Sequence, residues 1–195
     1  MADRIPLTTT SYVIPIGDLS LDSRGNVRDT VDAGLVQFAL DRKITTEASA
    51  LVVRDVLPFT DLGLAGQTNS EDWLIVGAAT AGTLLNYLAA KQLTTTQAIA
   101  FYGVGSPMAS PGVSGLKFLF GNSGAQVKAY YHLQQLFMRL EYAGYFGSPL
   151  YYGPQEYVQI QVMPITSFAQ NTEYLTLFAR EVEQFGFTIS AKNAI

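Results

Sequence analysis

Cysteine is absent from this 195-residue chain, and charged residues are scarce. Without cysteine, the chain has no disulfide framework, no thiolate metal ligand and no cysteine nucleophile. Charged residues make up 14% of the chain, against about 25% in a typical soluble domain. A monomer usually covers its surface with charged side chains. We therefore expect either a surface of Thr, Ser, Gln and Asn or a surface largely covered by other subunits.

Histidine occurs once, at His132, which excludes a multi-histidine zinc site within one chain. Any Ser-His-Asp arrangement would have to use this residue. It falls out of register with the apolar positions of its segment, so we expect it to face solvent or a neighbouring subunit. The glycines at 103 and 105 lack the third glycine of a dinucleotide fingerprint, and no phosphate-binding loop occurs. We expect a protein that is not an enzyme and uses no cofactor.

The net charge is −4, and acidic and basic residues are mixed along the chain. Broad binding to phosphate backbones needs clustered Lys and Arg, so we expect no sequence-specific nucleic-acid binding. The first residues lack the apolar segment and cleavage site of a secretion signal. Residues 73–90 are uncharged and long enough to span a bilayer. They contain Thr80, Thr83 and Asn86 without flanking basic clusters, so we expect a buried strand leading into a short helix or loop.

Glycine and proline recur along the chain, 17 and 8 times respectively, which favours many short strands over long helices. Residues 84–92 and 133–142 have the apolar spacing of short helices, and residues 174–185 fit a helix or a strand equally well. The predicted strands are residues 11–16, 35–40, 51–57, 73–78, 97–104, 157–163 and 185–190.

A hairpin is predicted where residues 116–121 and 125–133 flank an Asn-Ser-Gly turn. Lys117 and Lys128 are expected to point outward. Strand 157–163 alternates in the same way, with Val158, Ile160 and Val162 on one face. We therefore predict a mainly β fold, a single jelly-roll or antiparallel β-sandwich with one to three short helices. The expected inward side chains of the hairpin are Leu116, Phe118, Phe120, Val127, Ala129, Tyr131 and Leu133.

Oxygen-bearing side chains occupy alternate positions in residues 18–29, loosely as in a calcium loop. Ser23 stands where such a loop needs glycine, and Arg24 and Arg28 bring positive charge. The plain alternative is a turn whose side chains hydrogen-bond the local backbone. We favour the turn and predict no metal, while ion binding by this segment stays open.

The strongest pattern is aromatic and uncharged. Residues 142–172 contain one charged residue, Glu156, and residues 73–116 contain one, Lys91. Interface cores are depleted of charge and enriched in aromatic residues. A tyrosine-rich core and a sugar-binding aromatic platform are the alternatives. We predict a subunit interface at Tyr142, Tyr145, Phe146, Tyr151, Tyr152 and Tyr157.

The hairpin, the helix-like residues 134–142, the Gly-Tyr-Phe-Gly-Ser-Pro corner at 144–149 and the strand at 156–163 occur in this order. Together they resemble part of the jelly-roll coat (capsid) proteins of icosahedral viruses. The resemblance implies a subunit that tiles a shell through edge and loop contacts, with no catalytic residues. Residues 1–17 would form an extended N-terminal arm, and residues 18–195 a single sandwich domain.

We therefore expect a virion structural protein: a self-assembling coat subunit, located in the virion after assembly in the host cytoplasm. It would enclose the genome without base recognition, and any contact with nucleic acid would come from a few arginines such as Arg4, Arg24 or Arg28. Its partners would be copies of itself and other virion proteins, with an internal membrane or the genome on its inner face and no small-molecule substrate.

Two other classes of protein remain as alternatives. A jelly-roll carbohydrate-binding module would use Tyr145, Tyr151 or Tyr152 as stacking platforms. A β-sandwich hydrolase would need Glu141, Glu156 or His132 in one pocket, since glycoside hydrolysis uses a pair of carboxyl groups. Solvated surface positions are the favoured account of these carboxylates.

Overall fold

The computed structural model describes residues 12–64, 71–107, 112–121, 126–134, 136 and 142–185. Its helical segments are η1 (Ile16–Asp18), α1 (Leu21–Asp41), η2 (Ala48–Ala50) and α2 (Pro58–Leu62). Its strands are β1 (Val13–Pro15), β2 (Leu51–Asp55), β3 (Leu74–Ile75), β4 (Leu85–Gln92), β5 (Gln97–Gly105), β6 (Val113–Phe120), β7 (Gln126–His132), β8 (Ala143–Tyr152), β9 (Tyr157–Pro164), β10 (Glu173–Tyr174) and β11 (Thr176–Gln184).

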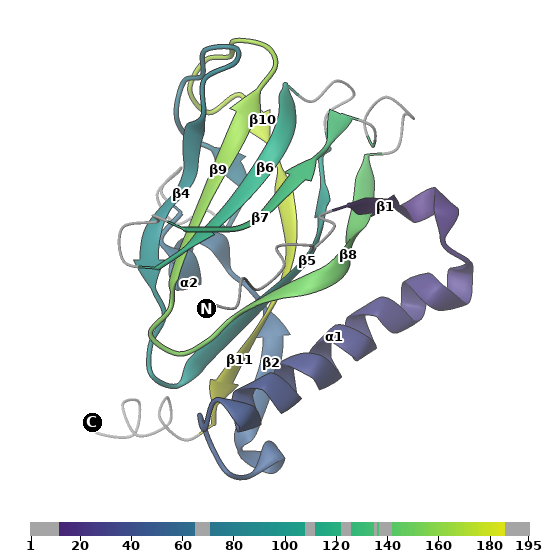
Figure 1. Ribbon diagram of the computed structural model, residues 1–195, viewed down its shortest axis with the longest axis vertical. Helices are drawn as coiled ribbons and strands as arrows, with labels where there is room; N and C mark the ends of the chain where they lie inside the picture. Colours follow the sequence, from purple (N-terminus) through teal and green to yellow (C-terminus); the bar gives the residue numbers. More distant parts are fainter. Residues whose placement is uncertain are drawn as a thin grey trace, which may run out of the picture.

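Two antiparallel sheets form a sandwich (Figure 1). The five-stranded sheet has the order β1-β8-β5-β11-β2, and the four-stranded sheet has the order β4-β9-β6-β7. Without β1, these two sheets contain eight strands, which can be numbered 1 to 8 along the chain. The five-stranded sheet then has the order 6-3-8-1, and the four-stranded sheet has the order 2-7-4-5. Two interleaved Greek keys of this kind make a jelly roll. The prediction of a mainly β sandwich is confirmed.

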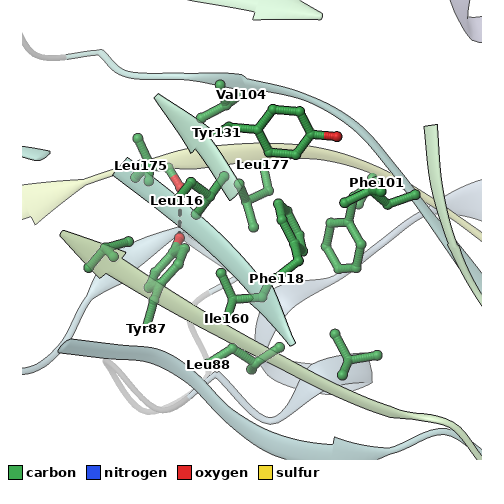
Figure 2. Close-up of a cluster of buried hydrophobic side chains, with 14 of the residues drawn as sticks. Tyr87, Leu88, Phe101, Val104, Leu116, Phe118, Tyr131, Ile160, Leu175 and Leu177 are labelled. Carbon is green, nitrogen blue, oxygen red and sulfur yellow. Dashed lines mark hydrogen bonds between the residues drawn. The ribbon is translucent and has the colours of Figure 1, made fainter. Parts of the chain in front are cut away.

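The core lies between the two sheets (Figure 2). Phe101 of β5 contacts Phe118 of β6, with ring centroids 5.2 Å apart. The hydroxyl of Tyr87 donates a 2.7 Å hydrogen bond to the carbonyl of Leu175, so this buried phenol is satisfied. On β9 the alternation is as predicted, since Val158, Ile160 and Val162 are all fully buried.

Helix α1 replaces two predicted elements, the turn at 18–29 and the strand at 35–40, and both predictions are wrong. Ser20 caps the helix, accepting a 3.1 Å hydrogen bond from the N–H of Ser23. The helix buries Val31, Leu35 and Ala39, spaced four residues apart, against the outer face of the five-stranded sheet. At 21 residues it is also longer than the short helices expected.

The predicted helix at 84–92 is the edge strand β4, which pairs with β9. Its register to β9 shifts between Asn86 and Leu88, so that the consecutive residues Tyr87 and Leu88 are both buried. This irregularity hides the two-residue period of the strand, and the good helix formers around it then dominate the sequence pattern. The ambiguous segment 174–185 is mostly strand β11.

The predicted pairing of β6 with β7 is confirmed. Near the start of β7, however, the side chains point to the opposite faces from those predicted. The register shifts between Phe118 and Leu119, which pair with Ala129 and Val127, so that Lys128 is the extra residue of a bulge. Val127 is 45% exposed instead of inward. Lys128, predicted to point outward, places its ammonium 3.9 Å from the ring centroid of Tyr152.

Several predicted elements lie partly or wholly outside the described residues. Residues 134 and 136 are helical, but most of the predicted helix 133–142 is not described, nor is most of the strand 185–190 or of the N-terminal arm. Of the predicted strand 73–78, β3 is the strand part. No helix in the described part of the chain is long and apolar enough to cross a membrane.

Candidate functional site

Three half-buried aromatic rings lie together on the outer face of the five-stranded sheet. Tyr102 comes from β5, Tyr145 from β8 and Phe178 from β11, which are adjacent strands. The rings of Tyr102 and Tyr145 are stacked, 6.1 Å apart with an interplanar angle of 14°. Phe178 lies 6.0 Å from Tyr102 and 5.9 Å from Tyr145. We call this cluster the aromatic platform.

Glycines of β5 allow two rings of the platform to lie close against the sheet. A Cβ atom at Gly103 would come within 2.6 Å of the Phe178 ring and 3.2 Å of the Tyr145 ring. A Cβ atom at Gly105 would lie 3.3 Å from Phe178. Any larger residue at 103 would force these rings off the backbone. The platform is therefore preformed by the local sequence.

A groove of about 400 Å³ runs beside the platform, between the first half of α1 and the sheet. Tyr102 and Tyr145 form part of its wall, so the platform and groove are one continuous surface. Val27, Val31 and Pro149 add apolar lining, and Ser23, Asn26 and Thr30 of α1 add polar groups. An apolar surface with a few polar groups is suited to bind a side chain or a small ring.

An ion-pair network fixes α1 beside this surface. Arg180 of β11 binds Asp32 of α1 through Nε and Nη2, and it binds Asp55 of β2 through Nη1 at 2.7 Å. Arg28 of α1 contacts the second oxygen of Asp55 at 3.1 Å. The hydrogen bonds to Asp32 raise the pKa of Arg180, which stays charged. The helix that walls the groove is thus tied to two strands of the sheet.

The predicted interface residues divide into four groups, of which three are at least partly exposed. Tyr142 is exposed and Tyr145 belongs to the platform, so both offer surface to a partner. Tyr157 is half-buried on the outer face of the other sheet, opposite the inward residues of β9. Tyr151 is stacked on Phe38 of α1, with ring centroids 5.2 Å apart.

Phe146 and Tyr152 belong to the core and are corrected accordingly. Phe146 stacks on Tyr131 with ring centroids 4.0 Å apart. Tyr152 is fully buried, and its hydroxyl donates a 3.0 Å hydrogen bond to the carbonyl of Leu119. The two-residue period of β8 turns these side chains inward, as the tyrosine-rich core alternative proposed for such residues. Tyr152 therefore has no face free for a sugar ring to stack on.

The candidate catalytic residues are not brought together. His132 pairs with Gly115 near one end of β6, whereas Glu156 adjoins β9 at the other end, where Leu119 pairs with Gln159. Glu156 lies 3.7 Å from Arg42 and 3.5 Å from Lys128. Glu141 lies outside the described residues. His132 and Glu156 therefore do not share a pocket.

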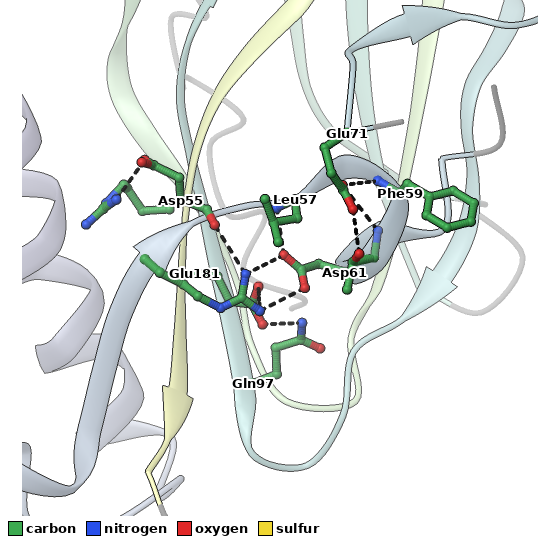
Figure 3. Close-up of polar contacts among 10 residues, drawn as sticks. Asp55, Leu57, Phe59, Asp61, Glu71, Gln97 and Glu181 are labelled. Atoms are coloured by element: carbon green, nitrogen blue, oxygen red, sulfur yellow. Dashed lines mark hydrogen bonds and ion pairs between the residues drawn. The ribbon is translucent and has the colours of Figure 1, made fainter. Parts of the chain in front are cut away.

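The structure also contains a buried charged cluster that the sequence pattern did not reveal (Figure 3). Arg54 binds both oxygens of Asp61, at 2.7 and 2.8 Å, and lies 3.0 Å from Glu181. The side chain of Glu181 is 1% exposed and accepts a 2.5 Å hydrogen bond from Gln97. The residues come from β2, α2, β11 and β5, so the cluster holds α2 against the sandwich.

Burial sets the charges of this cluster. Desolvation and the neighbouring Asp61 raise the pKa of Glu181 to about 8. Burial alone would raise the pKa of Asp61 as well, but hydrogen bonds from Arg54 and from the N–H of Leu57 lower it. Near neutral pH the cluster thus holds an ionised Asp61, a cationic Arg54 and a largely protonated Glu181.

Residues 18–29 lie mainly in the first turns of α1, and the calcium-loop alternative for them is overturned because a helix does not form that loop. Within the described ranges, no group of three or more metal-ligating side chains comes together. The arginines considered for genome contact are engaged within the chain where they are described. Nε of Arg24 donates a 3.1 Å hydrogen bond to the carbonyl of Leu19, and Arg28 pairs with Asp55.

No protein-family model matches this chain, and a search of curated proteins finds no match either.

Proposed function

We propose that this chain is a virion structural protein, a self-assembling coat subunit that encloses a viral genome. The observation that carries the proposal is the preformed, half-buried aromatic platform on a chain with few charged residues. Aromatic rings fixed on a rigid sheet are typical anchors of protein interfaces. The groove beside them is a recess that would enclose a side chain of a neighbouring subunit.

The fold supports this proposal without deciding it. Coat proteins of icosahedral viruses use the jelly-roll strand order found here, but lectin-like domains and cupins use it too. The proposal therefore rests on the surface. Tyr102, Tyr145 and Phe178 expose aromatic area that a monomer gains nothing by exposing, and which an interface would bury.

Under this proposal, the partners are copies of the same chain and other virion proteins, at the site of the virion. The genome is enclosed without base recognition, since the net charge is −4 and acidic and basic residues are mixed along the chain. A catalytic role is not proposed, because His132 and Glu156 lie near opposite ends of the four-stranded sheet.

Alanine substitutions in the platform test the proposal. Tyr102→Ala and Tyr145→Ala should each weaken self-association about tenfold or more, the scale of an interface hot spot. Tyr130→Ala is the matched control, since it removes a half-buried tyrosine of β7 from the outer face of the other sheet, at a position outside the predicted interface residues. If all three variants associate as strongly as the wild-type protein, the platform is not part of the interface.

The platform also gives one observation in favour of the carbohydrate-binding alternative. Aromatic rings lying against a sheet beside a groove with polar groups could stack on sugar rings, with Tyr145 and Tyr102 as the platform. Of the tyrosines first considered for that role, Tyr151 already has Phe38 stacked on it and Tyr152 is buried. Glycan-array binding that is lost in Tyr145→Ala, by a protein that stays monomeric, would favour this alternative over the coat subunit.

A further inference from the structure

Two neighbouring loops lie at one end of the sandwich, where β4 begins and β9 ends (Figure 1). They are residues 76–84 and 165–172, and together we call them the loop tip. Most of their residues are exposed, and none of them carries a charge. The tip thus joins the two uncharged parts of the sequence at one place on the surface.

Hydrogen bonds hold the loop tip in one conformation. Ala79 and Phe168 exchange two backbone hydrogen bonds, of 3.0 and 3.2 Å. The N–H of Gly82 donates to the carbonyl of Pro164 at 2.8 Å, and the N–H of Ala81 donates to the hydroxyl of Ser167 at 3.1 Å. Because the two loops are already joined, little further ordering is required when a partner binds.

The loop tip also exposes two large apolar side chains, Leu84 at 39% and Ile165 at 48%. Around them stand small hydroxyl and amide side chains. Such groups donate and accept hydrogen bonds, so each can pair with another group of its own kind. The exposed polar residues are Thr80, Thr83, Thr166, Ser167, Gln170, Asn171 and Thr172.

The absence of charge indicates which partner the tip fits. Where copies of a chain meet about a rotation axis, residues near the axis face the same residues of the next copy. A charged residue there would face a like charge, which costs several kcal/mol, whereas a different partner could supply an opposite charge. The depletion is local, because the other end of β4 carries Lys91 and lies near Glu156 and Arg42.

We propose that the loop tip is the surface through which copies of this chain associate about a rotation axis. This inference rests on the proposed function as a self-assembling subunit, and it names the surface and the partner. A single cyclic interface closes into a ring, so a shell needs contacts of more than one kind. The tip supplies one of these contacts, and the aromatic platform supplies another.

Opposite charges placed at one position of the tip test the proposal. Thr83 is exposed and lies just before β4. The variants Thr83→Asp and Thr83→Lys are each purified, and their self-association is measured by light scattering alone and after mixing in equal amounts. Each variant alone should associate at least tenfold more weakly than the wild-type protein, because like charges meet at the axis. The mixture should regain association at least in part, since unlike charges then meet between most neighbouring copies, whatever the order of the axis.

Thr95→Asp and Thr95→Lys are the matched controls, because Thr95 is exposed in the turn that follows the other end of β4. They should associate as the wild-type protein does. Thermal unfolding of all four variants checks that the fold is unchanged.

The outcomes separate the tip from the proposed function. If the wild-type protein assembles and the Thr83 variants assemble equally well, the tip is not a contact between copies. Weakened variants that mixing fails to restore would also overturn the proposal, because position 83 would then not face its own copies. A wild-type protein that does not assemble would instead refute the proposed function.

Discussion

The guanidinium of Arg180 on β11 holds the carboxylate of Asp32 on α1 with two hydrogen bonds, of 2.6 and 2.8 Å. The side chain of Arg180 is 6% exposed, so the pair is largely removed from water. This fork-to-fork contact joins residues far apart in the sequence and fixes the helix that walls the groove. The position of α1 therefore depends on a specific ion pair as well as on its apolar stripe.

Removal of this carboxylate should loosen α1. We expect Asp32→Ala to lower the free energy of unfolding by about 3 kcal/mol, because it leaves a buried guanidinium with one partner instead of two. Asp29→Ala, at an exposed position of the same helix, should change it by less than about 0.5 kcal/mol. Urea unfolding of both variants measures the difference, and equal stabilities would show that the pair contributes nothing.

Stability should fall with rising pH because of Glu181. Its pKa is raised from 4.5 to about 8 in the folded protein. Between these values the folded state keeps a proton that the unfolded chain has released, so the free energy of unfolding decreases as pH rises. The slope from this group is at most about 1.4 kcal/mol per pH unit. This stabilisation is complete below pH 4.5 and lost above pH 8.

The variant Glu181→Gln should remove this slope, because a neutral amide stands in for the protonated carboxyl at every pH. It should be more stable than the wild-type protein above pH 8 and similar to it near pH 5. Denaturant unfolding at several pH values measures both curves, with the exposed Glu47→Gln as control. An unchanged slope in Glu181→Gln would contradict the assignment of the proton to this residue.

Two glycines should respond oppositely to alanine. A Cβ atom at Gly103 would lie 2.7 Å from the carbonyl oxygen of Gly144 and 2.6 Å from Phe178, so Gly103→Ala should cost about 1–3 kcal/mol of stability. Gly25 lies inside α1 with nothing within 4 Å of the added atom. Gly25→Ala should therefore stabilise the protein by about 0.5–1 kcal/mol. Thermal unfolding compares them, and a tolerated Gly103→Ala would show that the platform needs no glycine beneath it.

Regular strands were predictable from the sequence, and irregular ones were not. Strand β9 keeps a strict two-residue period, and its buried residues were identified correctly. In β4 and β7 a shifted register breaks that period, which hid a strand in one case and inverted Lys128 in the other. Helix α1 was not predicted, although Val27, Val31, Leu35 and Ala39 stand four residues apart, because the frequent glycines, which include Gly25 and Gly34, favour short strands over a long helix.

The candidate site could be predicted only in part. Tyr145 was named as an interface residue, but its neighbours Tyr102 and Phe178 lie about 40 and 30 residues away in the sequence. They meet because β5 lies between β8 and β11, and a single sequence does not give strand order. The buried cluster of Arg54, Asp61 and Glu181 was missed for the same reason, since its members come from three separate elements.

The mass of the wild-type protein in solution tests the central claim most directly. Light scattering over a dilution series, with electron micrographs of the same fractions, measures whether the chain assembles. The coat-subunit proposal predicts stable trimers, pentamers, hexamers or closed shells that persist on dilution. A monomer at every concentration would contradict it.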